Sequence, residues 1–315
     1  ISLGLVGSEM CIRDSVDAVV KQLDDIETRQ KQLLGCSSEA AVTPTGCDVT
    51  VRFQAQVLRT FAPVQVYAQT LLAVKLIKAD PRVVGLNFVA PEDHRIALRD
   101  YRQHMRFVAE LSAAFPSRPA GIALHAGELT IGLVPPEDLG WHIRDAVATA
   151  GATRIGHGID IAYDDDMDGL LKTMAKQDVM VEINLTSNDV ILGIRGAAHP
   201  LPTYLEYGVP VTLSTDDEGV SRIDLTHEYQ RAATTYNLGY SQLRGFARNS
   251  LQYSFLPGAR LFDNPEKGQA VSACANQDLG STDTSRMCAE FLAASPKATL
   301  QWELEKRLSA FEARF

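Results

Sequence analysis

The sequence has few of the features typical of membrane or nucleic-acid-binding proteins. It contains no run of about 18 apolar residues, so no membrane span is expected. Lys and Arg total 30 against 39 Asp and Glu, which gives a net charge of -9. Because phosphate contacts require a basic face, we do not expect a nucleic-acid partner. These absences favour a small neutral or cationic molecule as the partner.

Several common binding motifs are also missing. No G-x-G-x-x-G follows an early strand, which argues against a doubly wound dinucleotide-binding sheet. No C-x-x-C pair is present, so the cysteines lack the usual spacing of a structural zinc site. The remaining composition, 45% hydrophobic and 22% charged over 315 residues, is that of an ordinary globular protein.

The five cysteines are few, and four of them form two local pairs. Cys36 and Cys47 flank a polar loop, and Cys274 and Cys288 flank another near the C-terminus. Local pairs of this kind favour two disulfides over four free thiols or zinc ligation. We therefore expect a periplasmic or secreted protein, with a cytoplasmic location as the alternative.

The first fifteen residues, ISLGLVGSEMCIRDS, differ from the rest of the chain. They resemble read-through of a sequencing adaptor, and no basic segment precedes their apolar stretch as it would in a signal peptide. We expect residues 1–15 to be artefactual or unstructured. Residues 16–315 are then expected to form one partial barrel domain with C-terminal helices.

Hydrophobic runs and helical periodicities alternate along the chain, which predicts an α/β fold with a parallel sheet. A closed (β/α)8 barrel requires eight strands, and we count six. The sequence therefore predicts a barrel whose first two strands are missing from this chain, with an open doubly wound sheet as the alternative. The predicted strands are Val49–Gln56, Val83–Val89, Gly121–Leu124, Arg154–Ile161, Val179–Leu185 and Val209–Ser214.

Polar residues end three of these strands, where active sites of α/β barrels lie. His125 is followed by Gly127 and Glu128, His157 lies between two glycines, and Asp216 is followed by Asp217. Each feature has an ordinary explanation: a histidine satisfied by backbone, a glycine turn, or a solvated aspartate pair. Together they indicate a metal-assisted hydrolase.

Three motifs, in order and spacing, resemble the signatures of the adenosine deaminase family. They are His125-Ala-Gly-Glu128, Arg154-Ile-Gly-His157-Gly158 and Ser214-Thr-Asp-Asp217, and Asn184-Leu-Thr-Ser-Asn188 resembles a strand-end segment of that family. The resemblance implies a metal-dependent hydrolase barrel that removes the 6-amino group of adenosine or 2'-deoxyadenosine. It covers about residues 49–256, and its Ser187–Glu218 part is nearest to a bacterial, exported branch.

The resemblance also implies a role for each matching residue. His125 and Asp216 would be zinc ligands, Glu128 would protonate purine N1, and His157 would orient and deprotonate the zinc-bound water. Asp217 would bind N7, and Gly127 would lie near the purine. Ala90 stands where the family usually has glycine, and its N–H would contact N3.

One part of the family pattern has no counterpart here. The family's first strand supplies His-x-His, whereas no histidine precedes His94 in this chain. His94 and His104 lie in or beside a helix and are expected to be solvated. With two protein ligands instead of three or more, this chain is expected to bind zinc weakly and to show little activity.

Two alternatives to an adenosine deaminase remain open. A related aminohydrolase could act on adenine or AMP, although no basic phosphate site is evident near the motifs. A protein of another class, a non-catalytic purine binder, could retain the fold. Oligomeric state is not indicated by the sequence.

Overall fold

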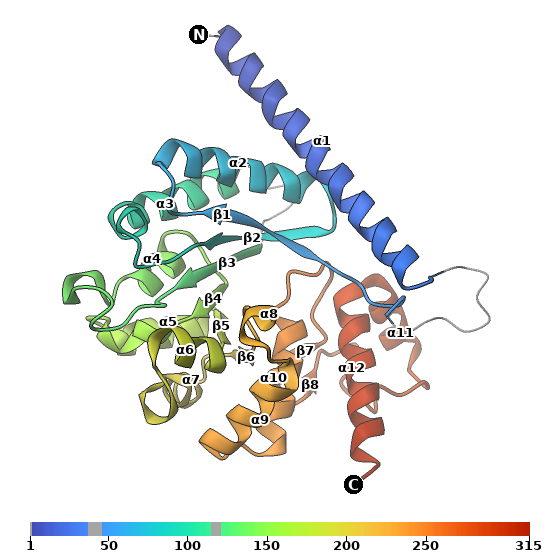
Figure 1. Cartoon of the computed structure of the whole chain (residues 1–315). Helices are drawn as coiled ribbons and strands as arrows, with labels where there is room; N and C mark the ends of the chain where they lie inside the picture. Colours follow the sequence, from blue (N-terminus) through green and yellow to red (C-terminus); the bar gives the residue numbers. More distant parts are fainter. Residues whose placement is uncertain (1, 37–45, 115–120) are drawn as a thin grey trace. The chain divides into compact units, whose positions relative to one another are not determined.

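The computed structural model describes residues 2–36, 46–114 and 121–315 (Figure 1). The chain divides into two compact units, residues 1–122 and 123–315. Among the described residues, no helix combines the length and the hydrophobicity needed to cross a bilayer.

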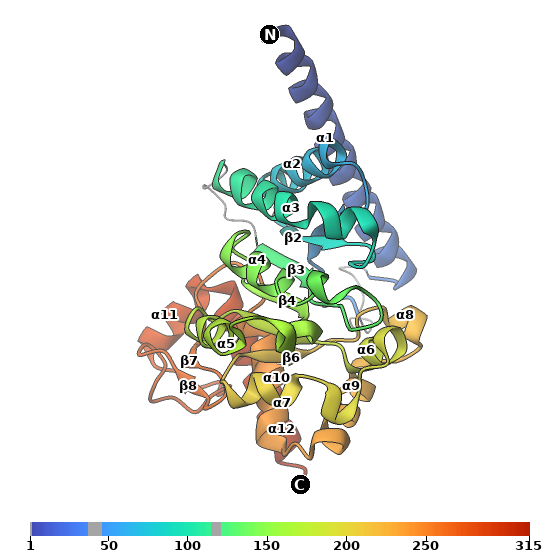
Figure 2. The same cartoon turned by 90° about the vertical axis from the view of Figure 1, so that its left-hand side faces the viewer.

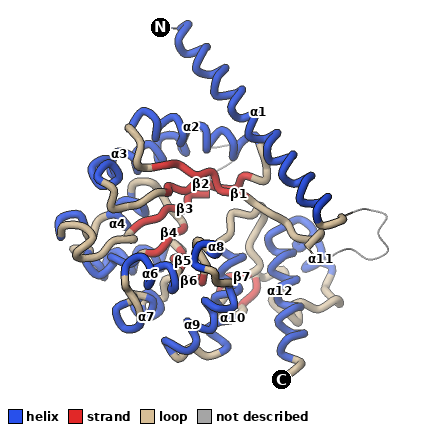
Figure 3. Tube along the Cα trace, viewed as in Figure 1, coloured by secondary structure: helices blue, strands red, loops and turns tan. Residues whose placement is uncertain are grey.

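Six strands pair in chain order, and every pairing is parallel. Their order can be followed in Figure 3. This arrangement, with helices between the strands, confirms the predicted α/β class. The strands are β1 (Phe53–Leu58), β2 (Val83–Val89), β3 (Gly121–Ala126), β4 (Arg154–His157), β5 (Met180–Ile183) and β6 (Val211–Leu213).

Among its described residues, the first unit has three helices, and the second of them packs against β1 and β2. The helices of this unit are α1 (Ser2–Leu33), α2 (Pro63–Ala79) and α3 (Arg95–Ala114). Helix α1 includes residues 2–15, and the expectation that residues 1–15 are an artefact stays a prediction. Arg82 forms ion pairs with Asp24 and Glu27 of α1 at 2.8 and 3.1 Å, which connects this helix to the start of β2.

The prediction that His104 is solvated is wrong. Helix α3 buries a stripe at helical spacing, Ala97, Tyr101, His104, Met105, Val108 and Leu111. His104 belongs to this stripe and is fully buried, whereas His94 before the helix is exposed. Burial lowers the pKa of His104 to about 4, because the cationic ring loses its hydration.

In the second unit, helices alternate with β4, β5 and β6 along the chain, and helices also form its C-terminal part. Its helices are α4 (His142–Ala148), α5 (Met167–Lys176), α6 (Leu185–Leu192), α7 (Leu201–Glu206), α8 (Glu218–Ser221), α9 (Leu225–Tyr236), α10 (Tyr240–Gln252), α11 (Arg286–Ala294) and α12 (Pro296–Glu312). A hairpin of β7 (Phe262–Asn264) and β8 (Gln269–Ala270), not predicted from the sequence, follows α10.

Two features hold the C-terminal helices in place. Arg248 of α10 donates two hydrogen bonds of 2.7 Å to Glu305 of α12, and both side chains are buried. Cys274 and Cys288 form a disulfide within a small apolar cluster that includes Trp302. In the first unit Cys36 is bonded to Cys47, so both predicted pairings are confirmed.

The predicted strand Arg154–Ile161 ends earlier than expected. Strand β4 stops at His157, and a 3-10 helix, Ile159–Tyr163, follows it. Backbone N–H groups of Ile159 and Asp160 donate to the Gly127 carbonyl at 2.9 and 3.1 Å. These bonds tie the end of β4 to the turn that follows β3.

Gly127 is required at this turn for a reason that the sequence did not indicate. Its φ is +76°, and an added Cβ would overlap Asp160 Oδ1 and lie 2.8 Å from Ile143 Cδ1. A side chain at this position would point into protein, so backbone conformation and packing both require glycine here.

The burial of His104 makes stability sensitive to acid. Its folded-state pKa of about 4 lies below the unfolded value of 6.5, so its contribution is complete above pH 6.5 and is lost as the pH falls toward 4. Neither ring nitrogen has a hydrogen-bond partner within the described residues. Between pH 7 and pH 5, the unfolding free energy of His104→Leu should fall by about 2 kcal/mol less than that of wild type. Urea titrations at both pH values measure this difference. Exposed His94→Asn is the control, and equal pH dependence in all three proteins would contradict the assignment.

The two reasons for glycine, backbone conformation and space, can be separated. Gly151 has φ +71° and nothing within 4 Å of an added Cβ. Gly151→Ala should therefore cost only about 1 kcal/mol of unfolding free energy, from backbone strain. Gly127→Ala should cost about 3 kcal/mol or more, because overlap adds to the same strain. Equal losses in urea denaturation would show that the space around Gly127 is not limiting.

Candidate metal-binding active site

Three predicted site residues converge at the carboxyl ends of the strands of the second unit. His125 is in β3, His157 ends β4, and Asp216 follows β6. Each offers one potential ligand atom, and these atoms all lie within 4.8 Å of one another. The imidazole rings have centroids 5.0 Å apart, and His157 Nε2 lies 3.9 Å from Asp216 Oδ2.

The donor set is chemically suited to a divalent transition metal. Two imidazoles and one carboxylate are a ligand combination found in catalytic zinc sites, where a fourth position stays open for water. The sequence assigned His125 and Asp216 to the metal and His157 to catalysis. The geometry brings all three together, so His157 is a further potential ligand by position.

His157 reaches this cluster through an unusual backbone conformation. In the β3–β4 register, His157 pairs with Ala126, while His125 pairs with Gly156. Because successive side chains of a strand point to opposite faces, a regular strand would direct His157 away from the face of His125. Its φ is instead +70°, and Gly158 N donates to Gly156 O at 3.0 Å, so the strand closes in a γ-turn at His157. This turn re-aims the imidazole.

Tyr204 braces the turn. Its hydroxyl donates to the Gly158 carbonyl at 2.6 Å. A Cβ added at Gly158 would lie 2.5 Å from the Tyr204 hydroxyl oxygen. Burial raises the pKa of Tyr204, so the phenol keeps the proton that it donates. Glycine is thus required at position 158, next to His157, because the buried Tyr204 hydroxyl leaves no room for a side chain.

Two more predicted site residues, a metal ligand and a substrate-binding residue, have left-handed backbone. Asp216 has φ +54°, and its N–H donates to Ser214 Oγ at 3.3 Å. Ala90 follows β2 in the first unit with φ +77°. This conformation favours glycine, which agrees with the glycine expected from the family at this position. Strained backbone of this kind is often found at functional sites.

The remaining predicted residues are placed as follows. Glu128 Oε1 lies 3.4 Å from His157 Nδ1, with a side chain that is 15% exposed. Asp217 is exposed and is the N-cap residue of α8, although its side chain makes no capping hydrogen bond. The roles assigned to Glu128, Asp217, Gly127 and Ala90 remain predictions.

Residues at the start of α6 and its N-cap complete the polar site, although no roles were predicted for them. Ser187 Oγ donates to Asp216 Oδ2 at 2.7 Å. The side-chain nitrogens of Asn184 and Asn188 lie 3.3 and 2.9 Å from His157 Nδ1. The segment begins a helix, with Asn184 at its N-cap, and does not extend the strand. The run of polar residues directly after β5 was the available signal.

A buried polar network holds α6 against α9, and Figure 2 shows the two helices side by side. Thr186 N donates to the fully buried Glu228 at 3.2 Å, and the Thr186 hydroxyl donates to the same carboxylate. Arg231 donates to Thr186 Oγ1 at 3.1 Å and pairs with Asp189. The network fixes the helix that carries Ser187 and Asn188.

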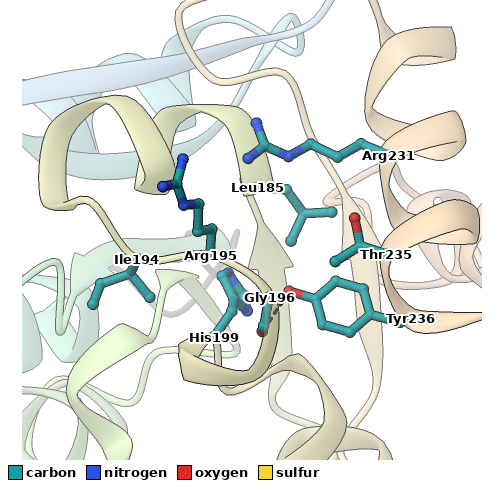
Figure 4. A pocket seen from close by; sticks show the side chains of 8 residues that line it. All are labelled: Leu185, Ile194, Arg195, Gly196, His199, Arg231, Thr235 and Tyr236. Carbon is teal, nitrogen blue, oxygen red and sulfur yellow. Dashed lines mark hydrogen bonds between the residues drawn. The ribbon is translucent and has the colours of Figure 1, made fainter.

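A cavity of about 350 Å³ lies beside this network (Figure 4). Arg195, Arg231, Tyr236 and the buried His199 are among its lining residues. Tyr236 donates to the Gly196 carbonyl at 3.2 Å. His199 also contacts Asn188, with its Nε2 3.2 Å from Asn188 Oδ1, so one residue borders both the cavity and the polar site.

Comparison with known proteins gives the family. The family model described as adenosine deaminase matches residues 26–262. An adenosine deaminase of Escherichia coli strain SE11 is 38% identical over 143 residues, which are 44% of this chain and 40% of the relative. The chain thus matches about two-fifths of the length of its curated relatives.

Two solved structures resemble this chain. A zinc-bound amidohydrolase from Burkholderia ambifaria has a TM-score of 0.52 at 16% identity, covering 70% of this chain and 55% of that one. An adenine deaminase from Arthrobacter aurescens has a TM-score of 0.49 at 20% identity, covering 66% and 57%. The first supports the barrel-type α/β fold. From the match over residues 26–262, the chain belongs to the adenosine deaminase family of hydrolases.

Proposed function

We propose that this protein hydrolyses adenosine and 2'-deoxyadenosine to the corresponding inosines and ammonia, with a zinc ion held by His125 and Asp216. The observation that supports this most is the convergence of His125, His157 and Asp216 within 4.8 Å, with Glu128 3.4 Å from His157. When bound, zinc would lower the pKa of water from about 15.7 toward 7 and so supply a nucleophile at neutral pH.

The protein's own residues would supply the remaining chemistry. Glu128 would donate a proton to purine N1, which makes C6 electrophilic. His157 would orient the attacking water and, in the family's scheme, take its proton. Asp217 would hydrogen-bond purine N7, while Gly127 and the Ala90 N–H would border the ring. Water enters at C6, and ammonia leaves.

The choice of purine is part of this proposal. Adenine and AMP are the alternative substrates, and a purine binder without catalysis is the alternative from another class. Side-by-side assays with adenosine, adenine and AMP distinguish the substrates, and binding without turnover of any of them would favour the binder.

We also propose that the protein works outside the cytoplasm, in a periplasm or as a secreted protein. The disulfides Cys36–Cys47 and Cys274–Cys288 support this, because such bonds persist in oxidising compartments. Free thiols at these positions in protein isolated from its native host would contradict it.

Zinc binding tests the ligand assignment. With His125 and Asp216 as the proposed ligands, we expect this chain to bind Zn²⁺ with micromolar or weaker affinity, measured by competition with a chromophoric chelator. His125→Ala should weaken binding at least about tenfold, which is the scale expected when a metal ligand or its support is lost. Exposed His227→Ala on α9 is the matched control. Submicromolar wild-type affinity would overturn the expectation of weak binding, and unchanged affinity in His125→Ala would overturn the site.

Deamination tests the acid role of Glu128. In zinc-loaded protein, Glu128→Gln should lower kcat/KM for adenosine by about 100-fold or more, because a general acid contributes 10²–10⁴ in rate. Ammonia release at high protein concentration would measure the low activity expected of this chain. Exposed Glu137→Gln serves as the control. If Glu128→Gln keeps wild-type activity, the proton at N1 must come from another group.

A further inference from the structure

A chain of hydrogen bonds leads from a backbone amide to the imidazole of His157. It begins at Leu201, whose N–H lies 3.1 Å from His199 Nδ1. A backbone N–H can only donate, so His199 Nδ1 accepts and carries no proton. The ring is buried, and burial lowers its pKa to about 4, so the neutral ring must hold its proton on Nε2.

This proton fixes the orientation of Asn188. His199 Nε2 lies 3.2 Å from Asn188 Oδ1, so the N–H donates to the amide oxygen. The amide nitrogen of Asn188 is then directed to the other side, where it lies 2.9 Å from His157 Nδ1. The assignment of oxygen and nitrogen in this amide therefore follows from Leu201.

The same reasoning reaches His157. An amide nitrogen only donates, so His157 Nδ1 must accept, and the neutral ring carries its proton on Nε2. The Asn184 nitrogen lies 3.3 Å from Nδ1 and 3.5 Å from Nε2 of His157, so this contact does not distinguish the two tautomers. Glu128 Oε1 at 3.4 Å is the competing neighbour, since an ionised carboxylate would prefer a proton on Nδ1. The Asn188 contact is shorter, and its direction is fixed by His199.

We propose that Asn188 and His199 act as positioning residues that hold His157 as the Nε2–H tautomer. His157 then donates a hydrogen bond from Nε2 toward the space before Asp216, and neither ligates a metal ion nor accepts a proton there. A metal-bound histidine normally donates a hydrogen bond from its second nitrogen, whereas this second nitrogen receives one.

The inference deepens the proposed function and rests on it for the role at the water. It keeps the orienting part of the role proposed for His157 and removes the proton-accepting part. The Asp216 carboxylate, whose Oδ2 lies 3.9 Å from His157 Nε2, faces the same space and is the acceptor within reach for the proton of the attacking water.

The tautomer can be observed directly in the full chain. Two-bond ¹H–¹⁵N correlation spectra of [¹⁵N]histidine-labelled protein at pH 7, in chelator, report which ring nitrogen carries the proton. His157→Gln identifies the resonances of His157. We expect the Nε2–H form at His157 and at His199, and a proton on Nδ1 of His157 would overturn the proposal.

An isosteric substitution tests the cause. Asn188→Asp replaces the donor that faces His157 by an acceptor and still accepts from His199. We expect His157 to move to the Nδ1–H tautomer, while His199 keeps its Nε2–H. Exposed Asn237→Asp should leave both rings unchanged. If His157 keeps the Nε2–H form in Asn188→Asp, then Asn188 does not set it.

Zinc addition separates this inference from the proposed function. Titration with Zn²⁺ should shift the ring resonances of His125 and leave the Nε2–H of His157 in place. Loss of that Nε2–H on zinc addition would show that His157 is a ligand and would overturn the proposal. The tautomer in chelator is independent of catalysis, so a chain without deaminase activity would contradict the proposed function and leave this result standing.

Discussion

The left-handed backbone of His157 is the constraint on which the candidate site depends. Strand pairing alone would place the imidazole on the face of Ala126, opposite His125. The γ-turn at the end of β4 changes that direction and brings the rings to a centroid distance of 5.0 Å. The strain is held by buried contacts on both sides, from Tyr204 to Gly158 and from Ile159 to Gly127. The precision of the site therefore comes from the turns that end the strands.

Helix α6 supplies the second part of this organisation. It begins directly after β5 and directs Ser187 to Asp216 and Asn188 to His157. Its own position depends on the buried carboxylate of Glu228, which accepts from Thr186, and on Arg231, which links Thr186 to Asp189. Burying a carboxylate without such donors costs folding free energy. Loss of one donor from the network would therefore strongly destabilise the fold. This explains why polar residues fill a segment that lies close to the core.

The strands and the three motifs could be predicted because apolar runs that end in polar residues are visible along one chain. Val83–Val89 is a strand with the predicted bounds. Asn184–Asn188 was matched to a strand-end segment by resemblance, but its contacts with Glu228 and His199 could not be predicted, because these residues lie in later elements of the chain. The γ-turn at His157 could not be predicted from the sequence, because the contacts that support it, from Tyr204 and Gly127, form only in the tertiary structure. His104, by contrast, was predictable, because it falls on the apolar spacing of α3.

The pairing of the four cysteines that follow Cys11 has a consequence for the order of folding. Each disulfide joins neighbours along the chain, across separations of 11 and 14 residues. Each bond closes a short loop within one compact unit, and loops of this length have a small closure entropy. Either crosslink can therefore form through local encounters before the distant parts of the chain have folded.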